Sequence, residues 1–287
     1  MTVQTLQAYL ASRPKELSAG PIAIIICEDD VEIESTIAHA RKVGFRHILT
    51  LSPEPLTKIV PAPGLTTLIF DTRRPDAHVT AVNAVNDTVP TGTWIYYGYN
   101  AEYLFFPFLE SRHIGEMLTF HTEERRSAML SYVIDLYAPD LQRFSNAVSV
   151  EEAMFDGTGY YSLGRKDSEG EYLDRQLDFH GGLRWRFEEF IPEHRRRIDR
   201  ISLFRSQPGL RLLTDYRFND EEYNTYSCPW HHNLTAAIAS FRVAKALVRN
   251  PGSRKEISDF TWRNSRRFDW SAQQLMDAGL MEPGQWF

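Results

Sequence analysis

The first hundred residues alternate between short apolar runs and segments with helical spacing of apolar positions. Residues 22–27 are apolar throughout, which is the pattern of a parallel strand covered by helices on both faces. An α/β fold follows, with a mixed, mostly parallel sheet flanked by helices. The predicted strands are 22–27, 47–51, 67–71 and 93–97, and the predicted helices are 31–43 and 79–87.

Beyond residue 108 this alternation fades, and we expect α+β elaboration packed on the same sheet. The whole chain, 1–287, is predicted to be a single domain with halves at 20–108 and 109–250 and a tail at 251–287. The tail is rich in large aromatic residues, so it should dock on the body of the protein. These residues are Trp262, Phe268, Trp270, Trp286 and Phe287.

Three segments of the second half carry more specific expectations. Residues 129–137 fit a helix by spacing, but their Tyr-Val-Ile content favours a strand. Residues 155–172 are rich in Gly, Ser and charge, which predicts a mobile loop. Residues 234–248 show the clearest helical pattern in the chain, closed by Asn250-Pro251-Gly252.

Charge and cysteine content narrow the class of protein. The net charge of −6 and pI near 5.9 argue against a nucleic-acid binder that depends on phosphate neutralisation. Cys27 and Cys228 show no Cys-x-x-Cys spacing, which fits a reduced, cytoplasmic setting. No apolar run approaches the ~20 residues that a transmembrane helix needs, and residues 1–20 lack the order of a signal peptide.

Polar side chains follow the predicted strands at their carboxyl ends, where open α/β sheets bind ligands. Carboxylates and amides there suit the ribose and base of a nucleotide, and carboxylates can share Mg²⁺ or Mn²⁺ with a diphosphate. The alternatives are that residues 28–30 only cap the following helix and that Asp71 only caps a loop. The candidate nucleotide-binding residues are Glu28, Asp29, Asp71, Asn100 and Glu102.

Several familiar motifs are missing. No Gly-x-Gly-x-x-Gly follows the first strand and no Gly-x-x-x-x-Gly-Lys-Ser/Thr occurs, which weakens dehydrogenase and P-loop interpretations. Gly-x-Ser-x-Gly and His-Glu-x-x-His are also absent, so these hydrolase classes lose support.

Residues 180–189 (His-Gly-Gly-Leu-Arg-Trp-Arg-Phe-Glu-Glu) combine paired glycines with two arginines. In an extended segment Arg184 and Arg186 would point to one side, as recognition of a diphosphate requires. Glu188 or Glu189 could then deprotonate an acceptor hydroxyl as a general base. The alternative is a glycine turn followed by an amphipathic edge with solvated charges.

Residues 228–233 place His231 and His232 directly before the strongest helical pattern. An imidazole there could complete a metal site with the turn at 100–102. Alternatively, Asn233 caps the helix while a histidine packs against Trp230.

In this order the motifs resemble the family 2-like glycosyltransferases of the GT-A type, in a bacterial subgroup with a shortened nucleotide-binding half. The match covers most of residues 20–248. Residues 98–104 stand in the place of the family's Asp-Ala-Asp-Glu-Phe-Leu, with Gly181–Arg186 and residues 201–209 following in order. The resemblance implies transfer of a sugar from a nucleoside diphosphate sugar, with 20–108 as the nucleotide half and 109–250 as the acceptor half.

The match departs from the family at the metal-binding motif. The two aspartates fall on Tyr99 and Ala101, so Glu102 is the remaining carboxylate, and His231 falls where the family places a late histidine. A divalent cation, Mn or Mg, is therefore possible but doubtful. Arginines could replace the metal's charge on the diphosphate, with Arg217 joining Arg184 and Arg186 as candidates.

Three functions remain open at this point. The first is a glycosyltransferase that moves a sugar from a nucleoside diphosphate sugar to a glycan or lipid-linked acceptor, inverting by direct displacement. The second is a non-catalytic relative that binds a nucleotide sugar, a glycan or a protein partner. The third is a metal-dependent hydrolase that uses the pair His231 and His232.

Overall fold

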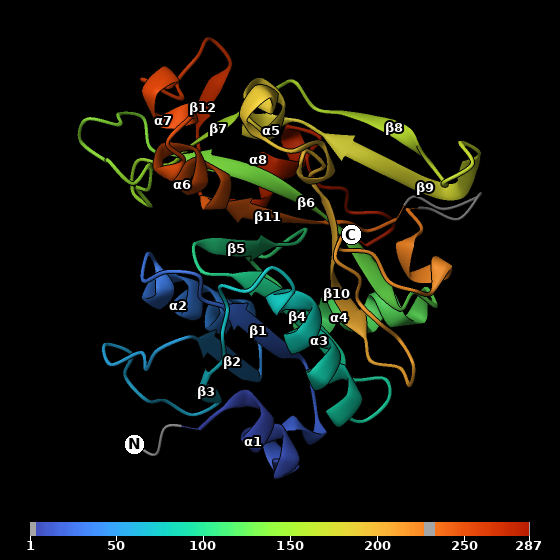
Figure 1. The fold of residues 1–287 in the computed structure, drawn as a ribbon. Helices are drawn as coiled ribbons and strands as arrows, with labels where there is room; N and C mark the ends of the chain where they lie inside the picture. The colour runs from blue at the N-terminus through green and yellow to red at the C-terminus, as the bar shows by residue number, and fades with distance from the viewer. Residues whose placement is uncertain (1–3, 227–232, 287) are drawn as a thin grey trace. The chain divides into compact units, whose positions relative to one another are not determined.

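The computed structural model describes residues 4–226 and 233–286 (Figure 1). The chain forms two compact units. Unit 1 comprises Met1–Tyr103, Arg112–Met129 and Ile201–Asn224, and unit 2 comprises Leu104–Ser111, Leu130–Arg200 and Thr225–Phe287. Each unit is described by itself.

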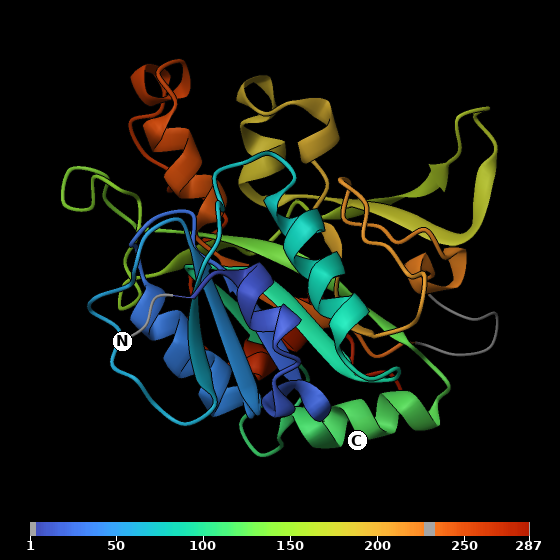
Figure 2. The same cartoon turned by 60° about the horizontal axis from the view of Figure 1, so that its bottom comes forward.

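Unit 1 contains four parallel strands in the spatial order β3-β2-β1-β4, with β10 antiparallel on β4. Helices α2 and α3 lie on opposite faces of these strands (Figures 1 and 2). This arrangement confirms the predicted α/β fold with a mixed, mostly parallel sheet flanked by helices. The strands are β1 (Ile22–Ile26), β2 (His47–Ser52), β3 (Leu65–Ile69), β4 (Trp94–Tyr99) and β10 (Asp199–Arg205), of which residues 201–205 belong to unit 1.

The helices of unit 1 follow the apolar periodicity of the sequence. The main ones, α2 (Ile33–Val43) and α3 (Ala77–Thr88), match the predictions for 31–43 and 79–87. Gly44 ends α2 in the left-handed conformation (φ 105°), and its N–H bonds back to carbonyls of the last turn. The remaining helical elements are α1 (Leu6–Ala11), α4 (Ile114–Glu123) and the 3-10 helices η1 (Lys15–Ser18) and η4 (Glu221–Asn224).

Unit 2 is built around β6 (Ala128–Tyr137), which confirms a strand at 129–137. It pairs antiparallel with β7 (Met154–Asp156) and parallel with β11 (Ala236–Ser240). β12 (Ser265–Arg267) extends the sheet on β7, and β5 (Glu102–Phe105) pairs with β11. The helical elements are α5 (Gly182–Arg186), α6 (Arg242–Arg249), α7 (Ser253–Glu256), α8 (Ala272–Asp277), η2 (Glu188–Phe190) and η3 (Glu193–Arg195).

The prediction of one helix over 234–248 is wrong. Residues 236–240 form β11, every residue of which is buried, and α6 begins only at Arg242. The small apolar residues of 236–240 fit a helix and a buried parallel strand equally well, so tertiary packing decided between them. Asn233 therefore does not cap a helix.

The prediction of a loop over 155–172 is also wrong. Half of it forms strands, and β8 (Tyr161–Lys166) and β9 (Tyr172–His180) make an antiparallel hairpin. The charged residues 167–171 lie at the hairpin turn, where Gly170 adopts a positive φ of 89°.

The aromatic tail packs within unit 2, as predicted. Phe268 contacts Phe105 and Phe155, with ring centroids 5.4 and 5.8 Å apart, and is almost fully buried. Trp286 lies against Phe106 and Phe108. These contacts join the C-terminal residues to the segment 104–111 in one core.

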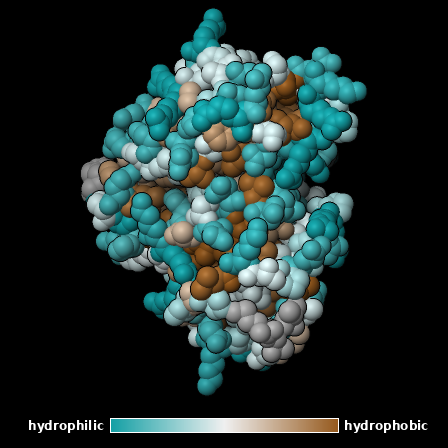
Figure 3. Space-filling view, turned by 90° about the vertical axis from the view of Figure 1, so that its left-hand side faces the viewer, coloured by the Kyte–Doolittle hydropathy of each residue, from teal (hydrophilic) through white to brown (hydrophobic). Residues whose placement is uncertain are grey.

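Hydrophilic residues cover most of the face shown in Figure 3. Within residues 4–226 and 233–286, no helix is long and apolar enough to cross a membrane.

Candidate functional sites

Unit 1 has a topological switch point between β1 and β4. The chain leaves β1 through α2 toward β2 on one side, while β4 lies on the other side and is reached through α3, so their carboxyl ends flank the position where such sheets bind ligands. Asn100 joins these ends. Its Oδ1 accepts from the Glu28 N–H at 2.9 Å, and its Nδ2 donates to the Asp29 carboxylate at 2.5 Å and to the Val31 carbonyl at 2.8 Å.

The residues after Asn100 form a strained turn. Ala101 is fully buried and adopts a left-handed conformation (φ 60°) that side chains with a Cβ disfavour. Its N–H donates to Thr36 Oγ1 of α2 at 2.9 Å, which holds the turn in place. Glu102 is buried and accepts from the Tyr99 N–H at 3.0 Å.

The structure brings most of the predicted nucleotide-binding residues to this edge. Glu28, Asp29 and Asn100 contact one another, and Glu102 belongs to the same turn. Thr72 donates to the Cys27 carbonyl at 2.6 Å and so draws the loop after β3 to the end of β1. The exposed carboxylate beside it, Asp71, accepts from the Arg73 N–H at 3.2 Å.

Two details differ from the expected capping roles. Asp29 accepts from the Val31 N–H at 3.1 Å and thus closes a turn ahead of the helix, while the N-cap position of α2 is Glu32. Strand β3 ends at Ile69, so Asp71 lies in the loop beyond the strand that it was predicted to close.

An aromatic group that the sequence did not suggest lies at the end of β4. The hydroxyls of Tyr99 and Tyr216 are 3.1 Å apart, and the Tyr216 ring stacks on His78 of α3 with centroids 4.6 Å apart. This contact places the turn at 215–217 beside the last residue of β4. A tyrosine at the end of an apolar strand is the sequence feature that could have indicated it.

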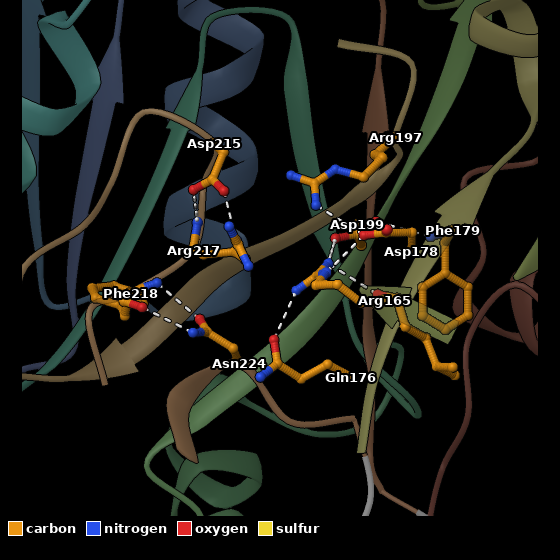
Figure 4. A network of polar contacts seen from close by, with 11 residues as sticks. Arg165, Gln176, Asp178, Phe179, Arg197, Asp199, Asp215, Arg217, Phe218 and Asn224 are labelled. Atoms are coloured by element: carbon orange, nitrogen blue, oxygen red, sulfur yellow. Dashed lines mark hydrogen bonds and ion pairs between the residues drawn. The ribbon is translucent and has the colours of Figure 1, made fainter. Parts of the chain in front are cut away.

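Arg217 belongs to that turn and is paired locally. Its Nε donates to Asp215 at 2.6 Å, and both side chains are 31% exposed (Figure 4). A partly exposed pair of this kind can reorganise around an incoming anion at little cost. Arg217 is therefore the diphosphate candidate that unit 1 itself supplies.

The described residues do not fit a divalent metal ion around Glu102. Its neighbours Tyr99 and Ala101 supply no carboxylate, and Glu102 already accepts a backbone hydrogen bond. Across residues 4–226 and 233–286, no group of three or more His, Cys, Asp or Glu side chains is arranged to hold a metal. The second predicted ligand, His231, lies outside the described residues, as do His232 and Cys228.

In unit 2 the glycine–arginine motif is helical, so the predicted extended segment is wrong. Residues 182–186 form α5, and both arginines turn inward. Arg184 pairs with buried Asp135 of β6 at 3.0 Å, and Arg186 pairs with buried Asp156 of β7 at 3.0 Å. A diphosphate would therefore have to compete with these internal carboxylates for both arginines.

Asp156 is the centre of a buried polar cluster. It accepts from the Tyr137 hydroxyl at 2.6 Å and from Trp262 Nε1 at 2.7 Å, in addition to Arg186. Arg186 also donates to the Phe260 carbonyl at 2.7 Å, and its guanidinium lies 4.8 Å from the Trp262 ring centroid. The carboxylate is therefore saturated by protein donors, which is how a buried charge is tolerated.

The glycines of the motif allow close packing. Gly181 (φ 153°) and Gly182 (φ 61°) adopt positive φ, and a Cβ on Gly181 would collide with the Tyr160 ring. The Tyr160 hydroxyl is buried and has no hydrogen-bond partner among residues 4–226 and 233–286, and burial raises its pKa well above the ordinary value. The close backbone approach expected from the sequence thus serves a neighbouring tyrosine.

A second arginine network fastens the hairpin within unit 2 (Figure 4). Arg165 donates to Asp178 at 2.7 Å and to Asp199 at 2.5 Å, and Arg197 donates to Asp178 at 2.9 Å. Burial raises the pKa of Asp178, but the hydrogen bonds from both arginines outweigh it and leave that pKa lowered. No sequence signal indicated this pairing, because Arg165 lies in a segment predicted to be a loop and Arg197 ends a run of three arginines.

The predicted bases Glu188 and Glu189 lie in η2, immediately after α5, and both are exposed. Glu188 faces Arg196 at 3.7 Å. Their exposure is compatible with contact to a large substrate.

The sequence matches no known protein-family model and no curated protein. Function is therefore inferred from the chemistry of these sites.

Proposed function

We propose that the protein is a glycosyltransferase that moves a sugar from a nucleoside diphosphate sugar to a glycan or lipid-linked acceptor. The observation that carries the proposal is the switch point in unit 1, where Asn100 joins the ends of β1 and β4 among Glu28, Asp29 and Asp71. Acceptors of hydrogen bonds at this position suit the ribose hydroxyls of a nucleotide. The resemblance to the GT-A type supplies the reaction class.

Within the proposal, the residues divide by burial. Asn100 and Glu102 are buried and already hydrogen-bonded, so they position the turn, while the more accessible Glu28 and Asp71 contact the nucleoside. Arg217 offsets the charge of the leaving diphosphate. Glu188 or Glu189 of unit 2 is the candidate general base for the acceptor hydroxyl.

The proposal is tested by thermal denaturation with UDP-, GDP-, ADP- and dTDP-sugars, each with and without Mn²⁺. A donor at 100 times its Kd should stabilise the protein by ~2.7 kcal/mol. Glu28→Gln and Asp71→Ala should reduce this stabilisation. The matched control is Glu123→Gln, an exposed carboxylate in the last turn of α4, next to Thr122, which bonds to Trp94 at the amino end of β4. No stabilisation by any of these donors would overturn the proposal.

A non-catalytic binding protein is the second candidate. The observation in its favour is that Arg184, Arg186 and Arg217 are each paired with an aspartate of their own unit. Release of nucleoside diphosphate from a donor that stabilises the protein separates the two. Turnover that falls at least tenfold in Glu188→Gln or Glu189→Gln supports the transferase, while binding without any turnover over a panel of glycan acceptors favours the second candidate.

A further inference from the structure

Unit 2 exposes large hydrophobic side chains on the hairpin and on α5. Among the described residues of this unit they are Tyr161, Leu163, Tyr172 and Trp185. Large side chains that are kept in water on ordered elements usually mark a binding surface when they lie together. Two of them, Tyr161 and Trp185, come from segments that the glycines of the motif bring into contact.

Trp185 is held in place by its neighbours in the chain. Arg184 and Arg186 turn inward to Asp135 and Asp156, which anchors both ends of the short helix, and Trp185 between them is 41% exposed. Its ring packs on Gly159, where a Cβ would come within 3.1 Å of it. The ion pairs therefore hold the backbone on either side of the exposed indole, which limits the conformational entropy lost on binding.

Tyr161 lies two residues beyond Gly159 and is held in a similar way. It is opposite His180 in the hairpin register, and the two rings stack with centroids 5.1 Å apart and planes inclined by 19°. The tyrosine remains 44% exposed. We call Trp185, Tyr161 and His180 the aromatic platform.

We propose that the aromatic platform binds a sugar ring of a glycan. A pyranose has a face of C–H groups that packs on an aromatic ring and a rim of hydroxyls that needs polar partners. Charged residues lie close to the platform along the backbone: Arg197 forms a backbone bridge to His180, and exposed Glu188 and Glu189 follow Trp185 by three and four residues. A stable protein–protein interface would bury roughly 800 Å² of this protein's surface. The three rings of the platform offer a smaller surface, of a size that suits one or two sugar units.

The platform gives the acceptor a place beside its proposed base. Glu188 follows Trp185 by three residues and is exposed, so we assign it as the carboxylate that meets a hydroxyl of the bound glycan. This identification of the glycan as the acceptor rests on the proposed function. Glycan binding itself does not, because it can be measured without a donor.

The experiment is calorimetric titration of the full-length protein with cellohexaose, maltohexaose, chitohexaose and mannohexaose. At least one should bind, with Kd rising tenfold or more in Trp185→Ala and in Tyr161→Ala, and less in Trp185→Phe. The matched control is Tyr172→Ala, which removes the most exposed aromatic of the hairpin, 70% exposed and packed on Gly164 away from the platform. Unchanged melting temperatures exclude misfolding.

The proposal is overturned if no probe binds, if Tyr172→Ala weakens binding as much as Trp185→Ala, or if Trp185→Ala binds like the wild type. Capture of a peptide in place of a sugar would also overturn it. Donor stabilisation is measured on the same variants. Glycan binding without stabilisation by any donor would support the platform and overturn the transferase proposal. Stabilisation by a donor without glycan binding would overturn the platform proposal alone.

Discussion

The turn at 100–102 in unit 1 and the glycine–arginine motif in unit 2 both bury polar side chains, but they leave different side chains accessible. At the turn, the Asn100 amide forms hydrogen bonds that hold two strand ends together. The more accessible carboxylates of Glu28 and Asp71 lie beside it. In the motif, Arg184 and Arg186 form ion pairs with buried aspartates, and Trp185 between them remains exposed. Burial, more than residue type, decides which side chain is available to a ligand.

The two regions also differ in how their interior polar groups are paired. Unit 1 closes its turn with hydrogen bonds from the Asn100 amide and from backbone N–H groups, and the carboxylates of Asp29 and Glu102 are among the acceptors. Unit 2 closes its motif with two ion pairs between arginine and aspartate, and removal of one partner from such a buried pair is strongly destabilising. The variants below test this difference, and those with the strongest predicted effect come first.

Asp156→Ala should break the interior of unit 2. It would leave the Arg186 charge, the Tyr137 hydroxyl and the Trp262 N–H without their acceptor, at a cost of about 4 kcal/mol in the free energy of unfolding. Urea denaturation measures it. Glu152→Ala, which removes the exposed pair with Arg143, is the control and should leave the free energy of unfolding almost unchanged, because solvent screens such a pair. Equal effects would show that the buried pair has no special weight.

His121 sharpens the contrast by testing a neutral buried group of unit 1. Burial lowers its pKa to about 4, and its Nε2 lies 2.9 Å from the Ala128 carbonyl. The unfolded chain binds the proton more tightly than the folded protein does. The contribution of neutral His121 to the free energy of unfolding is therefore fully present above pH ~6.5 and falls by about 3 kcal/mol as the pH drops toward 4.

In His121→Gln this part of the pH dependence should vanish. Urea denaturation at pH 7.0 and 4.5 gives the difference between wild type and variant. The control is His113→Gln, at the N-cap of α4. The same pH dependence in the wild type and in His121→Gln would contradict the assignment.

Asn100→Ala should loosen the switch point. It would remove three hydrogen bonds, to the Glu28 N–H, the Asp29 carboxylate and the Val31 carbonyl, which costs about 2 kcal/mol. Donor stabilisation should fall with it, because the two strand ends lose their brace. Asn250→Ala, at an exposed turn where the amide accepts only from the Gly252 N–H, should change neither quantity appreciably. An Asn100→Ala protein with the stability of the wild type would show that Asn100 does not hold the two strand ends together.

Arg217→Ala should have the smallest effect on folding. Its pair with Asp215 is partly exposed, so the free energy of unfolding should change by less than ~1 kcal/mol. Donor affinity should nevertheless fall about tenfold, equivalent to ~1.4 kcal/mol, if Arg217 meets the diphosphate. Titration with the stabilising donor measures it, and unchanged affinity would exclude that role.

Local sequence patterns predicted much of unit 1 and its candidate site. The all-apolar run at 22–27 and the spacing in α2 and α3 are signals that a few neighbouring residues fix by themselves. The carboxyl ends of parallel strands meet at one edge of a sheet. The sequence alone therefore predicted that Glu28, Asp29 and Asn100 lie close together.

Unit 2 was less predictable because its determinants are distant in the chain. The run at 236–240 became a strand because β6 offered it a buried parallel partner. Local spacing could not show that. The arginines of α5 were assigned to a ligand because their aspartates lie 49 and 30 residues earlier, on β6 and β7.

The sequence by itself thus determined the alternation of strands and helices in unit 1 and the polar edge to which it leads. Only the tertiary structure decided that Arg184 and Arg186 face inward and that Trp185 faces water. The physical reason is that a charge can be buried only beside its partner, and the partner's position depends on strand pairing across the whole unit.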